Sequence, residues 1–130
     1  MSFVDSSALV SMLVQEPDAD GLLRRLLEVD VRKTSVLCKY EVMAALMRLR
    51  KANAAAVQRE VDAFLTTMEI DVLPVTVEDS NAALAAFETY GKGRGHPAQL
   101  NMGDCFSLAM AQRRGLRLIY KGNDFAALGL

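Results

Sequence analysis

The chain has 130 residues, of which 52% are hydrophobic and 24% are charged, a balance typical of a globular protein with a sizeable core. This size and composition predict a single domain covering residues 1–130 and argue against intrinsic disorder. The 15 basic and 16 acidic side chains give a formal net charge of −1, which excludes a general attraction to polyanions. Any nucleic acid would therefore have to be bound by a local basic patch.

The sequence shows no sign of membrane insertion, export or zinc binding. No run of apolar residues approaches the roughly 20 needed to span a bilayer, and the start, MSFVDSSALV, lacks the pattern of a signal peptide. We therefore expect a cytoplasmic protein with no membrane contact. Cys38 and Cys105 lie far apart, without a CxxC motif and with one histidine in the chain, so reduced, buried thiols are expected.

Short apolar strands alternate with helices in the first half of the chain. In chain order, the predicted elements are a strand at 3–4, helices over 6–14 and 18–28, a strand over 31–37 and a helix over 39–51. Asp18 is the expected N-cap of the second helix. In this arrangement Asp5 falls at the end of a strand, and Glu41 falls in the first turn of a helix.

The alternation continues in the second half. The predicted elements are a helix over 54–68 capped by Asn53, a strand over 70–75, a helix over 78–90, a loop over 91–97, a helix over 103–114 and a strand over 116–120. The helices over 39–51 and 54–68 should form an apolar hairpin, and the glycine-rich, cationic loop is the expected hinge or lid. Asp104 falls in a first turn, and Asp124 follows the last strand.

This pattern predicts an α/β fold, with a central, mainly parallel sheet of about four to five strands flanked by helices as an α/β/α sandwich. Ligands of such sheets bind beyond the carboxyl ends of the strands, an edge that Asp5, Glu41, Asp104 and Asp124 can all reach. Taken alone, any one of these acids could have a purely structural role, in which its negative charge stabilises the N-terminus of a helix. Four together would repel by about 4 kcal/mol per pair at about 4 Å, so a divalent cation is the natural partner.

Oxygen ligands alone favour Mg²⁺, with Mn²⁺ as a possible substitute, over zinc. One such ion, or two close together, could lower the pKa of a water for attack on a phosphodiester and neutralise charge in the transition state. The residues therefore suggest in-line hydrolysis without a protein nucleophile.

Four segments, VDSSALV, YEVMAALMR, LNMGDCFSLAMA and LIYKGNDF, resemble the PIN-domain ribonucleases, in particular the VapC toxins of type II toxin-antitoxin systems. The resemblance covers nearly the whole chain and implies a PIN-like fold. It also implies that Asp5, Glu41, Asp104 and Asp124 are metal-binding catalytic acids. The implied protein is a Mg²⁺-dependent endoribonuclease, a toxin that forms a homodimer and is silenced by a small antitoxin docking at its active site.

Several other side chains are weaker candidates. Those that could orient a carboxylate or a bound water, but could equally serve caps or turns, are Ser7, Asn101 and Asn123. Those that could contact RNA or the antitoxin, but could equally form surface ion pairs, are Arg48, Lys92, Arg94 and Lys121. Cys38 and Tyr40 depart from the small or aliphatic residues usual before the glutamate, a departure expected to affect packing more than chemistry.

Two alternative functions are considered. A catalytically inactive PIN-like binding module would keep the fold, although a relict site has no reason to retain four costly like charges. A phosphoacceptor receiver-type signalling domain also places an aspartate at a strand end and a lysine after the last strand. It requires a paired acid beside the first aspartate, where this chain has Ser6 and Ser7.

Overall fold

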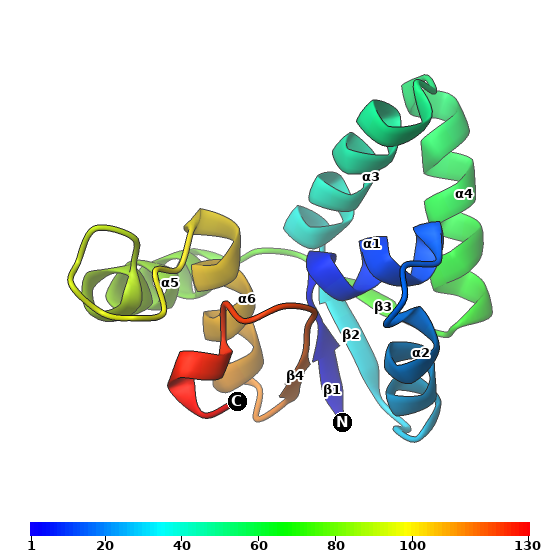
Figure 1. Cartoon of the computed structure of the whole chain (residues 1–130). Coiled ribbons are helices and arrows are strands. Elements are labelled where there is room, and N and C mark those ends of the chain that lie inside the picture. The colour runs from blue at the N-terminus through cyan, green and yellow to red at the C-terminus, as the bar shows by residue number, and fades with distance from the viewer.

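A computed structural model describes all residues from 1 to 130, and a fully parallel four-stranded sheet lies at its centre (Figure 1). The strands are β1 (Ser2–Val4), β2 (Arg32–Ser35), β3 (Asp71–Leu73) and β4 (Arg117–Ile119). Their order across the sheet is β3-β2-β1-β4. The prediction of an α/β fold with a mainly parallel sheet is therefore confirmed.

Helices cover both faces of the sheet. The helices on one face are α1 (Ser6–Val14), α2 (Ala19–Leu27), α3 (Val36–Arg50) and α4 (Ala54–Thr67), and those on the other are α5 (Val77–Tyr90) and α6 (Met102–Arg113), as Figure 1 shows. A short 3₁₀ helix, η1 (Ala126–Leu128), ends the chain. No helix is both long enough and apolar enough to cross a bilayer.

The central strands contribute to two separate apolar cores because successive side chains on a strand point to opposite faces. Val4 and Ile119 pack with the helices α1 to α4, whereas Phe3 and Leu118 pack with α5 and α6. Leu118 and Ile119 pair with Phe3 and Val4, so the two strands alternate in step. Burial on both faces explains why these strands read as continuous apolar runs.

The third helix begins earlier than its sequence pattern predicts. Ser35 ends β2 and accepts a hydrogen bond from the backbone N of Cys38 at 3.0 Å, so α3 starts at Val36. The prediction that Glu41 lies in a first turn is therefore wrong, because the helix has already completed one turn when it reaches that residue. An N-cap serine outweighed the β-branched residues around it.

Two further expectations about caps and loops need adjustment. Asp18 stands at the N-cap position of α2, but its carboxylate accepts from Ser11 Oγ at 2.7 Å and makes no cap hydrogen bond. The loop after α5 is not a free hinge, because Gly91 and Leu100 form a parallel bridge and Lys92 N donates to Leu100 O at 2.8 Å. By contrast, Asn53 caps α4 as expected, and α3 and α4 form the predicted hairpin.

Candidate active site

The candidate site lies at the carboxyl end of β1, where the direction of strand addition reverses. The chain first adds β2 and β3 on one side of β1 and then places β4 on the other. Such a switch point opens a crevice between the loops that leave the two neighbouring strands. Asp5 leaves β1 at this point, and the segment carrying Asp124 leaves β4, with Asp5 N donating to Ile119 O at 2.9 Å.

Asp5 is only 3% exposed and is held on both carboxylate oxygens. Its Oδ2 accepts from the backbone N of Ser7 at 3.0 Å and from Ser7 Oγ at 2.6 Å, which makes it the N-cap of α1. Its Oδ1 accepts from Ser107 Oγ at 2.6 Å. Ser7 Oγ in turn accepts from the backbone N of Lys121 at 3.0 Å, which ties the segment after β4 to the start of α1.

Asp104 forms a capping box with Asn101 at the start of α6. Asp104 N donates to Asn101 Oδ1 at 2.8 Å, and Asn101 N donates to Asp104 Oδ2 at 3.1 Å. Burial, with the charges of Asp5, Asp124 and Glu41, raises the pKa of Asp104 to about 7 against the lowering effect of the Asn101 N–H. The other three acids expected from the sequence therefore all act electrostatically on Asp104.

Glu41 reaches the same place from α3. Its carboxylate lies against Gly103, where a Cβ would stand 2.4 Å from Glu41 Oε2, so only glycine fits there without moving the glutamate. Burial, with the charge of Asp5, raises the pKa of Glu41. Its Oε1 is buried and has no hydrogen-bond partner. A buried carboxylate oxygen without a partner is costly, and a cation would satisfy it.

Asp124 lies at the rim of the site and is exposed. Phe125 beside it is fully buried and packs edge-on against Tyr120, with ring centroids 5.1 Å apart, which anchors this segment after β4. Asn123 is also exposed, and its side chain makes no hydrogen bond. Of the three candidate orienting residues, Ser7 donates to a carboxylate through its side chain, Asn101 does so only through its backbone N, and Asn123 does not.

The carboxylate oxygens of these acids are suitable ligands for a hard divalent cation, although they do not form a complete coordination site. No three acidic, histidine or cysteine side chains converge closely enough to coordinate one ion. Carboxylates brought together repel one another, and a cation between them offsets that repulsion. The unpartnered oxygen of Glu41 and the raised pKa of Asp104 are the features that an ion at this edge would relieve.

The basic side chains that are candidates for contact with RNA or the antitoxin have different environments. Lys121 Nζ pairs with Glu16 at 2.9 Å and also approaches Asp18, so its ammonium is turned toward the end of α1. Lys92 and Arg94 are exposed in the loop after α5, and Arg94 Nε donates to the backbone of Glu88 at 3.3 Å. Arg48 is exposed near the end of α3, two turns beyond Glu41.

The sequence analysis missed Ser107, and it assigned Cys38 mainly to packing, which its burial in the apolar cluster with Phe3 and Leu108 confirms. Ser107 lies three positions after Asp104 in the same helix, a spacing that places both on one face and could have indicated it. Cys38 Sγ lies 3.3 Å from Ser107 Oγ, so it takes part in the polar contacts behind Asp5 as well as in packing. Both cysteines are free and buried, as expected.

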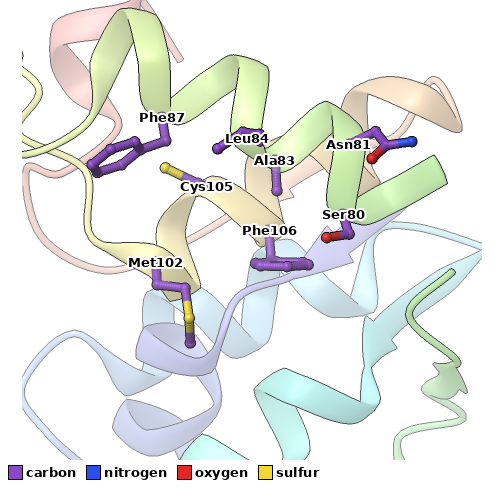
Figure 2. A pocket seen from close by; sticks show the side chains of 8 residues that line it. All are labelled: Ser80, Asn81, Ala83, Leu84, Phe87, Met102, Cys105 and Phe106. Carbon is purple, nitrogen blue, oxygen red and sulfur yellow. The ribbon is translucent and has the colours of Figure 1, made fainter. Parts of the chain in front are cut away.

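A separate hollow of about 330 Å³ lies between α5 and α6 (Figure 2). Six of its eight lining residues are hydrophobic, and Leu84, Phe87 and Met102 frame it in Figure 2. It contains no acidic or basic side chain, although Met102 and Cys105 flank Asp104 in sequence. Its chemistry is that of a contact surface beside the site, and we do not assign it to catalysis.

Comparison with known proteins identifies the class to which this fold and site belong. The family model described as "PIN domain" matches residues 2–129. The chain therefore belongs to the PIN-domain family, and its relatives place it among the VapC ribonucleases. Because this is a different class from the receiver-type signalling domains, that alternative is set aside.

The relatives match over nearly their full length. A VapC ribonuclease of Rhizobium meliloti is 40% identical over 100% of this chain and 99% of its own length. Ribonuclease VapC30 of Mycobacterium tuberculosis is 39% identical over 94% of this chain and 90% of its own. Among solved structures, Mycobacterium tuberculosis VapC20, described as a sarcin-ricin loop cleaving toxin, has a TM-score of 0.76 at 22% identity, covering 100% of this chain and 96% of that one.

A second solved structure, a toxin-antitoxin complex from Klebsiella pneumoniae, has a TM-score of 0.71 at 20% identity. It covers 97% of this chain and 91% of that chain. At these identities the two structures establish the shared fold.

Proposed function

We propose that this protein is a metal-dependent endoribonuclease that acts as the toxin of a toxin-antitoxin pair. The observation that carries the proposal is the unpartnered buried oxygen of Glu41, together with Asp104, whose pKa is raised to about 7 by burial and by the charges of Asp5, Asp124 and Glu41. The VapC ribonucleases that match over the whole chain support the choice of RNA as substrate. Such a function would be exercised in the cytoplasm.

Asp5, Glu41 and Asp104 would hold a Mg²⁺ ion, for which Mn²⁺ may substitute, and exposed Asp124 would contact it directly or through water. When bound, the ion supplies a water of lowered pKa and positive charge for the transition state. The protein's part is orientation: Ser7 fixes one oxygen of Asp5, and Asn101 fixes Asp104 at the start of α6. Four basic side chains are candidates for contact with RNA phosphates or with the antitoxin. Three are exposed, Lys92, Arg94 and Arg48, and the fourth, Lys121, is paired with Glu16.

The decisive experiment is cleavage of total RNA by purified variants in Mg²⁺ and in EDTA. Asp5→Asn and Asp104→Asn should each abolish cleavage while the protein stays folded, because each keeps the volume and removes a charged ligand. Asp71→Asn is the matched control, since that carboxylate is exposed and begins β3 at the opposite edge of the sheet. Full cleavage by both site variants, or undiminished cleavage in EDTA, would contradict the proposal and favour an inactive PIN-like binding module.

The proposed antitoxin has a suitable surface on the α3–α4 hairpin. A hollow of about 220 Å³ there is lined by Tyr40, Met43, Met47 and Val57, and Tyr40 is 65% exposed. Flexible methionines suit an apolar helix of a partner. The double variant Met43→Glu/Met47→Glu should still cleave RNA but should lose co-purification with a coexpressed antitoxin encoded beside it. Retained co-purification would contradict this surface.

We also propose a homodimer formed by the α5–α6 face. Leu84 and Met102 are 69% and 64% exposed at the edges of the apolar hollow of Figure 2. In a two-fold dimer both subunits use the same surface patch, so that patch must carry both a protruding side chain and a hollow to receive it. The α5–α6 face has both. Leu84→Glu should convert a dimer to a monomer in light scattering, whereas Leu49→Glu, at a 59% exposed site on α3, should not. A monomeric wild type would contradict the dimer.

A further inference from the structure

The carboxylate of Asp5 is held from behind by a residue that the sequence analysis did not identify. Ser107, in α6, is 1% exposed and its Oγ lies 2.6 Å from Asp5 Oδ1. Cys38, in α3, is equally buried, and its Sγ lies 3.3 Å from the same serine oxygen. Three elements on both sides of the sheet therefore meet at one hydroxyl group.

The direction of these hydrogen bonds follows from the donors available. An ionised carboxylate can only accept, so Ser107 must give its single proton to Asp5. The serine oxygen is then left as an acceptor, and the thiol of Cys38 is its donor. The same logic applies to Ser7, which donates to Oδ2 and accepts from the backbone N of Lys121. Each serine is thus fixed from two sides.

We propose that Ser107 and Cys38 are positioning residues that set the orientation of the Asp5 carboxylate toward the cation. The proposal rests on the metal-dependent function proposed above. The terminal torsion of an aspartate is broad, and the two Ser7 donors both bind Oδ2, so they leave Oδ1 and the plane of the carboxylate free to turn about that oxygen. The hydroxyl of Ser107 on Oδ1 removes that freedom before the ion binds. Cys38, as donor to Ser107 Oγ, keeps the proton of that hydroxyl directed at Asp5.

The test is the affinity for Mn²⁺ by titration calorimetry, in protein first stripped with EDTA. Ser107→Ala should weaken Mn²⁺ binding by roughly 10- to 100-fold, the usual loss when a group orienting a metal ligand is removed. Ser107→Thr, which keeps the hydroxyl, should restore binding. In cleavage assays, Ser107→Ala should lower kcat and leave the KM for RNA unchanged, because Ser107 is buried behind the acid.

A second pair of variants tests the thiol. Cys38→Ala should weaken Mn²⁺ binding less than Ser107→Ala does, and Cys38→Ser, which keeps a donor, should bind as the wild type does. Ser11→Ala is the matched control, because Ser11 is a buried serine whose Oγ donates at 2.7 Å to a carboxylate, Asp18, that is not one of the four candidate metal ligands. It should lower the melting temperature without changing Mn²⁺ affinity.

The outcomes separate the two proposals. A wild type that binds no Mn²⁺ would contradict the metal site itself and, with it, this inference. A wild type that binds Mn²⁺ while Ser107→Ala and Cys38→Ala bind equally well would overturn only the positioning role. If Ser107→Ala does not fold, the comparison of Cys38→Ala with Cys38→Ser decides the question.

Discussion

At the scale of single residues, Gly103 shows how closely Glu41 and α6 approach each other. An added Cβ would meet Glu41 Oε2 at 2.4 Å, and the carboxylate is the end of a flexible chain that can move away. Gly103→Ala should therefore displace Glu41 and lower RNA cleavage at least tenfold. The melting temperature should hold or rise, because alanine is favoured over glycine in a helix by up to about 1 kcal/mol.

Gly21→Ala is the control for this variant. Gly21 lies in α2, and nothing stands within 4 Å of the Cβ that alanine would add. This variant should be stabilised by a similar helix effect and should cleave RNA as the wild type does. Unchanged cleavage by Gly103→Ala would show that Glu41 need not occupy its present position.

At the scale of elements, α5 and α6 are joined by a buried ion pair. Asp79 is fully buried and accepts from Arg114 Nη1 at 2.8 Å and Nη2 at 3.0 Å, with Arg113 bound to the same carboxylate. Asp79 also completes a capping box with Thr76 at the start of α5. These partners, Arg114 foremost, hold the pKa of Asp79 well below its usual range. The helix predicted over 78–90 includes this acid in its first turn, but the sequence could not show its arginine partners.

Replacing this acid should destabilise the protein. Asp79→Asn should lower the free energy of unfolding by about 1–3 kcal/mol, because two arginines and a helix start lose a charged acceptor. Urea denaturation at pH 7 measures the loss, and Glu88→Gln, on the exposed side of α5, should change it little. Equal stability of Asp79→Asn and wild type would mean that the ion pair adds nothing.

The same ion pair predicts a dependence of stability on pH. Because the pKa of Asp79 is lowered in the folded state, its contribution is complete above the unfolded value of about 3.9 and is lost as the pH falls toward the folded value. Acidification below about pH 4 should therefore destabilise the wild type more steeply than Asp79→Asn. Parallel unfolding curves for the two proteins below that pH would contradict this reading.

At the scale of the whole molecule, a cation at the site should stabilise the fold. Binding to the folded state alone adds about 2.7 kcal/mol at an ion concentration 100 times the Kd. Mg²⁺ or Mn²⁺ should therefore raise the melting temperature of the wild type, and raise that of Asp104→Asn less. Equal shifts in thermal scans of the two proteins would count against a shared site.

The sequence alone determined the alternation of elements and pointed to four acids as candidates for the site. Apolar runs, N-cap residues and glycines are local signals, and they located every α-helix and strand to within a few residues, although not the 3₁₀ helix η1. The resemblance carried by VDSSALV and NMGDC also named the family that the comparisons confirm. The start of α3 was misplaced because Ser35 acts as a cap although its neighbours favour a strand.

Only the tertiary structure decided how the acids are held. The strand order β3-β2-β1-β4 brings Asp5 beside the segment after β4, and no local pattern encodes that order. Ser107 meets Asp5 across 102 positions, and Cys38, which was expected to affect packing more than chemistry, lies against the same serine. Such contacts depend on how α3 and α6 meet at β1. The sequence therefore indicated which acidic residues to consider, and the packing of the elements determined how their carboxylates are oriented.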